Sequence, residues 1–153
     1  MTNFETEINR SGYIVYTNKG DSMMPLLRQD KDLMVIRRIE APLKKYDVVL
    51  FKRENGAYVL HRITKVCGLG VFMIGGDNRH YSEPIPEEQI IGIMTEVIRD
   101  GKHIPVTDPE YLKYVKRVPF TRFRLKLGYL PQRITGKLRR IAGKIKRMIN
   151  GEK

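Results

Sequence analysis

The chain has 153 residues, of which 41% are hydrophobic, and its formal net charge is +12. This length and hydrophobic content suit one globular domain with a buried core and exclude a disordered chain. The single cysteine, Cys67, excludes an intramolecular disulfide framework and a cysteine-based metal site, so we expect a protein of a reducing compartment with no cofactor and no metal.

The N-terminal twelve residues, MTNFETEINRSG, are polar, so the sequence predicts no signal peptide. No run of about 18 apolar residues occurs anywhere, which predicts that the chain has no transmembrane helix. We therefore expect a cytoplasmic protein that is free or bound peripherally at a membrane.

Short apolar segments rich in β-branched and aromatic residues predict six strands. They cover residues 12–17, 32–39, 46–53, 57–66, 70–75 and 90–99. Asn55-Gly56 predicts a hairpin between the third and fourth segments, because both residues tolerate the positive φ that a tight hairpin turn requires. We expect a mainly β body, small and partly rolled up like a barrel.

Turn and loop residues separate the later strands. Gly75-Gly76-Asp77-Asn78 and Asp100-Gly101 predict turns. Residues 82–89 are rich in proline and glutamate and predict a loop or a short helical turn.

Positive charge is concentrated at the C-terminal end of the chain. Residues 1–110 hold 15 Lys/Arg and 16 Asp/Glu, whereas residues 111–153 hold 14 Lys/Arg and one Glu. A uniformly basic nucleic-acid-binding domain would not divide its charge in this way. The division predicts a near-neutral body over residues 1–106 and a basic helical extension over residues 107–153.

The basic extension begins with a helix-start signal. In Asp108-Pro109-Glu110, Asp108 suits the N-cap and Pro109 suits the first helical position. We expect a short helix over residues 110–118, ended by Pro119, and a second helix from about residue 131 to residue 149.

The second predicted helix is amphipathic. Its apolar residues recur every three or four positions, at Ile134, Leu138, Ile141, Ile145 and Met148. Because lysines and arginines surround them, residues 133–149 predict contact with an anionic membrane surface. Packing of the apolar side on the body or on a protein partner is the alternative. Nucleic acid is not an expected partner, since residues 130–153 contain no aromatic side chain for base stacking.

Ser22 lies in the stretch NKGDSMMPLL, which combines turn residues with two methionines. A serine hydroxyl becomes an effective nucleophile when a base accepts its proton, and three histidines are available. His61 lies in a predicted strand, whereas His80 and His103 lie in polar segments. A base held on a strand is the better candidate, although a structural histidine and an ordinary turn serine are the alternatives when each residue is taken singly.

Several short motifs, taken together, resemble the type I signal peptidases in the same order. They are Ser22-Met23-Met24-Pro25, residues 46–51 (YDVVLF), His61-Arg62-Ile63, Gly76-Asp77-Asn78 and Ile91-Gly92. The resemblance covers about residues 12–99 and implies the β catalytic fold that these peptidases share with the LexA-like repressors. Members of this superfamily use a lysine or a histidine as base, and His61 resembles the histidine type of the endoplasmic reticulum and archaea.

The resemblance implies a serine endopeptidase that removes a signal or leader peptide from a precursor peptide or protein. Ser22 would be the nucleophile, His61 the general base, and backbone N–H groups near Ser22 the oxyanion donors. Met23 and Met24 would line an apolar substrate pocket. Two acidic positions are implied in the third motif, and Asp77 and Glu83 fill them. We favour Asp77 as the support of His61, with Glu83 as the alternative.

We expect the chain to depart from signal peptidases in two ways, since the sequence predicts no membrane anchor ahead of Ser22 and predicts the basic extension. The alternative function is an inactive peptidase-fold binding module whose basic tail binds anionic membrane or nucleic acid. A self-cleaving repressor is least favoured, since no DNA-binding domain precedes Ser22 and position 61 is not lysine. With the usual histidine pKa of ~6.5, activity is expected to rise through about pH 6–7.5.

Overall fold

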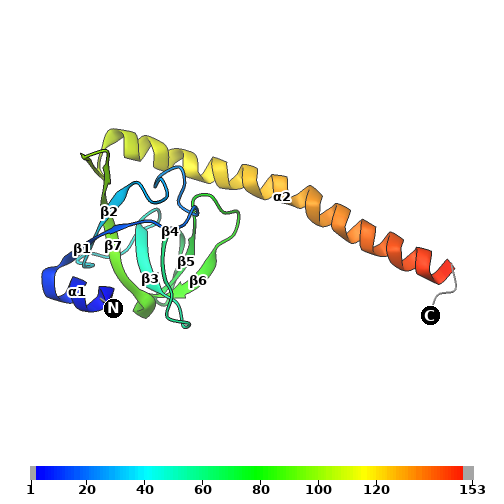
Figure 1. Cartoon of the computed structure of the whole chain (residues 1–153). Coiled ribbons are helices and arrows are strands. Elements are labelled where there is room, and N and C mark those ends of the chain that lie inside the picture. Colours follow the sequence, from blue (N-terminus) through cyan, green and yellow to red (C-terminus); the bar gives the residue numbers. More distant parts are fainter. Residues whose placement is uncertain (1–2, 150–153) are drawn as a thin grey trace.

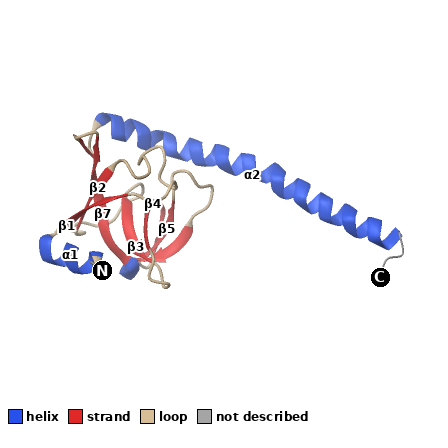
Figure 2. Cartoon of the chain, in the orientation of Figure 1, coloured by secondary structure: helices blue, strands red, loops and turns tan. Residues whose placement is uncertain are grey.

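A computed structural model describes residues 3–149 of the chain, and the side chains of residues 3–129 within that range. Its body is a curved antiparallel sheet of eight strands that forms a half-barrel, and a long C-terminal helix extends away from this body (Figure 1, Figure 2). The prediction of a mainly β body with a C-terminal helical extension is confirmed.

The strands are β1 (Tyr13–Thr17), β2 (Leu33–Arg37), β3 (Val48–Lys52), β4 (Tyr58–Gly68), β5 (Val71–Gly75), β6 (Glu83–Pro86), β7 (Ile90–Arg99) and β8 (Lys102–Pro105). Their order in the sheet is β1-β2-β7-β3-β4-β5-β6, and β8 pairs with β7. Because β7 lies between β2 and β3, it joins the N-terminal pair of strands to the four-stranded meander β3–β6.

The β3–β4 hairpin forms at the predicted Asn55-Gly56 turn. Gly56 has a φ of 83°, and the N–H of Arg53 donates to the carbonyl of Ala57 over 2.9 Å. The resulting register pairs Val49 with His61. The turn therefore fixes the position of His61 along the sheet.

The structure contains an N-terminal helix, α1 (Phe4–Ser11), that the polar sequence did not predict. The Asn3 side chain caps it by accepting from the Glu5 N–H at 3.1 Å. Ile8 is 2% exposed and lies in the core, with Phe4 packed against the same cluster. A single apolar pair one turn apart thus stabilises a short helix through tertiary packing.

Residues 82–89, predicted as a loop or a short helical turn, form strand β6 followed by the 3₁₀ turn η1 (Glu87–Gln89). Strand β8 was not predicted, although the turn that precedes it was. Asp100 and Gly101 both adopt positive φ and connect β7 to β8.

The C-terminal helix α2 runs without interruption from Pro109 to Ile149. Asp108 caps it as predicted, since its carboxylate accepts from the Glu110 N–H at 2.8 Å. The predictions that Pro119 ends a first helix and that a second begins near Pro131 are wrong. A proline inside a helix removes one backbone hydrogen bond. Here Val118 and Arg122, on either side of Pro119 in the chain, contact the body and stabilise the continuous helix.

The first ten residues of α2 belong structurally to the body. Tyr111 is 7% exposed and Val118 is 3% exposed, and Tyr111 lies in the main core cluster. The predicted boundary between residues 106 and 107 therefore does not separate two packed units.

The membrane-contact prediction for residues 133–149 concerns side chains outside the described part of the molecule. Among the described residues, no helix is long and apolar enough to cross a membrane.

Candidate active site

Ser22, in the segment between β1 and β2, meets His61 of strand β4, from which it is separated by 39 residues in the chain. The Ser22 Oγ lies 3.0 Å from the His61 Nε2. This is hydrogen-bond distance, as a general base needs for removing the hydroxyl proton. With the imidazole proton on Nδ1, Nε2 is free to accept that proton.

The turn that carries Ser22 is fastened to the body on both sides. Met23 and Leu27 are each 0% exposed in the main core cluster. From the other side, the N–H of Asn78 donates to the Ser22 carbonyl over 2.9 Å. The serine is therefore held by core packing and by the loop after β5.

Gly76 leaves no room for a side chain beside Ser22. A Cβ atom at this position would lie 2.6 Å from the Ser22 carbonyl oxygen and 2.9 Å from the Ser22 Cβ. The close approach of these two backbones requires glycine. Gly76 therefore allows the loop after β5 to pack directly against the turn that carries the candidate nucleophile.

Gly76→Ala is expected to reduce peptidase activity by about 100-fold, because moving a reacting group by roughly 1 Å has an effect of that size. The measurement is the initial rate of peptide cleavage by the variant. The matched control is Gly128→Ala, since a Cβ at Gly128 meets nothing within 4 Å. Equal rates for Gly76→Ala and the wild type would contradict the role of Gly76.

The His61 ring is buried, with 7% of the residue exposed. Burial lowers the pKa of His61 to about 4, and the negative charge of Glu83 opposes this shift without cancelling it. The Nδ1 atom has no hydrogen-bond partner among the described residues. The imidazole is therefore neutral at physiological pH and able to accept a proton.

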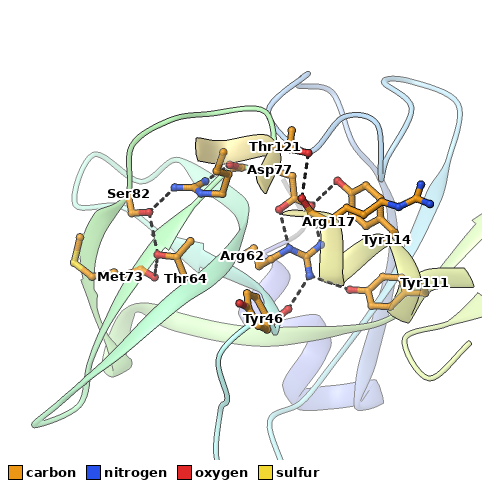
Figure 3. A network of polar contacts seen from close by, with 12 residues as sticks. Tyr46, Arg62, Thr64, Met73, Asp77, Ser82, Tyr111, Tyr114, Arg117 and Thr121 are labelled. Atoms are coloured by element: carbon orange, nitrogen blue, oxygen red, sulfur yellow. Dashed lines mark hydrogen bonds and ion pairs between the residues drawn. The ribbon is translucent and has the colours of Figure 1, made fainter. Parts of the chain in front are cut away.

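Asp77 does not contact His61 but forms a buried ion pair with the neighbouring Arg62. Both Asp77 carboxylate oxygens accept from Arg62 at 2.7 Å, and the two side chains are 1% and 0% exposed (Figure 3). The Tyr114 hydroxyl donates a third hydrogen bond to Asp77 at 3.0 Å. Asp77 therefore offers no hydrogen bond to His61, and its negative charge raises the pKa of His61 less than that of Glu83 does.

Glu83, the alternative acid, forms an ion pair with Arg53 at the start of β6. Its side chain is 30% exposed, and its charge raises the pKa of His61. Glu83 therefore acts on His61 through the electrostatic field and not through a hydrogen bond.

Helix α2 holds the loop that seats Ser22. Tyr114 bonds to Asp77, and the Arg122 guanidinium donates to the carbonyl of Gly76, to the Tyr81 carbonyl at 2.8 Å and to the Ser82 hydroxyl at 2.7 Å. Sequence reasoning assigned no role to these helix residues, and it named Arg62 only as a neighbour of His61. The signal for Arg62 was its place inside an apolar strand, because a buried cation requires an acidic partner.

An apolar groove of about 710 Å³ opens beside Ser22. Its walls include Ile14, Tyr16, Leu50 and Leu60. Met23 and Met24, predicted to line the substrate pocket, do not line this groove: Met23 is fully buried beneath the turn, and Met24 is 39% exposed on the surface. The side chains after Ser22 therefore anchor the turn, and the strands supply the groove.

The backbone N–H groups of Ser22 and Met23 donate no hydrogen bond within the described part of the chain.

The other two histidines lie away from Ser22. His80 stacks on Tyr129 with ring centroids 4.2 Å apart, and His103 pairs with Glu96. Within residues 3–129, no cluster of His, Cys, Asp and Glu is suited to hold a metal ion.

Comparison with known proteins leaves the family open. No protein-family model matches the chain, and no curated protein matches its sequence significantly. Function is therefore inferred from the geometry of the site and from the sequence motifs.

Proposed function

We propose that the protein is a serine endopeptidase of the signal peptidase type that cleaves a signal or leader peptide from a precursor. The observation that carries this proposal is the 3.0 Å contact between the Ser22 hydroxyl and the His61 Nε2 at the edge of an apolar groove. A serine beside a buried neutral imidazole has the chemistry of an activated nucleophile.

In the proposed reaction, the Ser22 Oγ attacks the scissile carbonyl carbon while its proton passes to the His61 Nε2. The N–H groups of Ser22 and Met23, which donate no hydrogen bond to the residues that the structure describes, donate to the oxyanion of the tetrahedral intermediate. As the C–N bond breaks, His61 gives its proton to the leaving amine. Water then attacks the acyl-enzyme with His61 again acting as base, which releases the acid product and restores Ser22.

The two acidic residues have different roles in this proposal. Glu83 stabilises the imidazolium that forms during the reaction, since its charge already raises the pKa of His61. Asp77 maintains the structure of the loop that seats Ser22, through Arg62 and Tyr114.

Activity is expected to rise with pH through a limb near pH 4 to 5 and to stay level through neutral pH. This limb lies below the one that an unperturbed histidine predicts, because burial lowers the pKa of His61 to about 4. The measurement is a pH profile of kcat/KM, which reports groups of the free enzyme. A limb that appears only above about pH 8.5 would instead indicate a lysine base, such as Lys65.

The same burial links folding to pH. In the unfolded chain the pKa of His61 is ~6.5, whereas in the folded protein it is about 4. Between these two pH values, His61 binds a proton in the unfolded chain but not in the folded protein. The His61 contribution to stability is therefore fully present above this window and is lost as pH falls through it. Rates below pH 5 require a parallel measurement of the folded fraction.

The groove suits an extended apolar segment such as the end of a leader peptide. We propose a cytoplasmic location, consistent with the exposed free thiol of Cys67.

The test of the proposed peptidase function is incubation with a degenerate peptide library and detection of new termini by mass spectrometry. The wild type and the exposed control His103→Ala are expected to cleave a common sequence, and His61→Ala is not. An inactive binding module would produce no cleavage in any of the three.

A further inference from the structure

Helix α2 presents an exposed apolar stripe on its described surface. Phe120 is 64% exposed, Phe123 is 57% exposed and Leu127 is 47% exposed. Large side chains with this much exposure on a single helix face indicate a contact surface. We call Phe120, Phe123 and Leu127 the apolar stripe.

The stripe faces away from the body. Its spacing of three and four residues places its members on one side of the helix, and Tyr114, Val118 and Arg122, which contact the body, lie on the opposite side. The uninterrupted helix keeps the register beyond Pro119. In the sequence, the same spacing continues with Leu130, Ile134, Leu138, Ile141, Ile145 and Met148.

Cations border the stripe without acidic partners. Lys116, Arg117, Arg124 and Lys126 are exposed, and none of them forms an ion pair within the described residues. The Arg124 guanidinium lies over the Phe120 ring, 6.0 Å from its centroid. The sequence from residue 111 to residue 149 contains no aspartate or glutamate. The partner of this face is therefore expected to be both apolar and anionic.

We propose that the apolar stripe docks on the surface of an anionic lipid bilayer, and that this contact begins at Phe120, beside the catalytic body. A bilayer interface takes up the aromatic and aliphatic side chains among its acyl chains and places the cations against lipid phosphates. A nucleic acid would pair with the cations but leave the stripe in water. The charge and the exposed apolar surface together thus favour lipid.

The docking places α2 between the membrane and the body that carries the candidate active site. Arg122, which lies between Phe120 and Phe123 in the chain, donates to the Gly76 carbonyl, and Gly76 packs directly against Ser22. The expected substrates are therefore precursors presented at an anionic membrane surface. This statement about substrates rests on the proposed peptidase function, whereas the lipid contact does not.

The test is co-sedimentation of the full chain with vesicles of phosphatidylcholine alone or mixed with phosphatidylglycerol. The wild type is expected to bind the anionic vesicles at least about tenfold more strongly, and added salt is expected to weaken this binding. The double variant Phe120→Ser/Phe123→Ser is expected to lose at least about tenfold in partitioning. The control Leu69→Ser, at a fully exposed apolar residue of the β4–β5 turn, is expected to bind like the wild type.

Unchanged binding of the double variant, or equal binding of the wild type to neutral and anionic vesicles, would overturn the proposal. Circular dichroism checks that the double variant folds, which is expected because both phenylalanines are exposed. Ser22→Ala is expected to bind vesicles like the wild type. If the wild type binds anionic vesicles but cleaves no peptide, the lipid contact stands and the proposed peptidase function fails.

Discussion

Ser22→Ala is expected to reduce peptidase activity by on the order of 10⁴-fold or more, because the alanine variant has no nucleophile to form the acyl-enzyme. The Ser22 hydroxyl has a single side-chain hydrogen-bond partner in the described structure, the His61 Nε2. Its loss should therefore leave the thermal midpoint nearly unchanged. The measurement is the cleavage rate of a peptide selected from the library, with stability followed in parallel.

The control for this prediction is Ser11→Ala, an exposed serine at the end of α1. It is expected to retain the wild-type rate. Retention of most activity by Ser22→Ala, with contaminating protease excluded, would refute the assignment of the nucleophile. An equal loss in both serine variants would show that the effect is not specific to the site.

Arg62→Met is expected to lower the free energy of unfolding by about 3–5 kcal/mol, the range for breaking a buried ion pair by removal of one partner. The Asp77 carboxylate would remain buried without its cation, and the carbonyl of Tyr46, which accepts from Arg62 at 2.7 Å, would lose a donor. Urea denaturation measures this change. Activity should fall as well, because Asp77 would no longer hold the loop that seats Ser22.

The matched control is Lys65→Met, the same type of substitution on the same strand but at an exposed position. It is expected to change stability by less than about 0.5 kcal/mol, as is usual for surface substitutions. A loss below about 1 kcal/mol for Arg62→Met would show that the Arg62–Asp77 pair contributes little to folding.

The parts of the fold that depend on local chemistry were predictable from the sequence. The Asn55-Gly56 hairpin and the Asp108 cap follow from conformational preferences of a few residues. Helix α1 and the passage of α2 through Pro119 were not predictable in this way, since both depend on packing against distant parts of the chain. Ile8 stabilises the first helix from the core, and Val118 and Arg122 stabilise the second.

In the candidate site, too, one part of the arrangement was predictable from the sequence and another part was not. The resemblance of the motifs implied that Ser22 and His61 act together, and the structure places the Ser22 Oγ 3.0 Å from the His61 Nε2. The partner of Asp77 was not evident, because adjacent strand residues point to opposite faces of a sheet. The His61 side chain therefore points toward Ser22. The Arg62 side chain points to the opposite face of the sheet, which α2 covers and where Asp77 and Tyr114 lie (Figure 3).

The direct test of the central claim is covalent labelling of the full chain with a fluorophosphonate probe, followed by intact mass measurement and peptide mapping. The probe reacts with a serine hydroxyl that a neighbouring base activates. One adduct is expected on Ser22, absent from Ser22→Ala and formed much more slowly in His61→Ala. No adduct, or an adduct on Ser11 or Ser82 in place of Ser22, would contradict the assignment of Ser22 as an activated nucleophile.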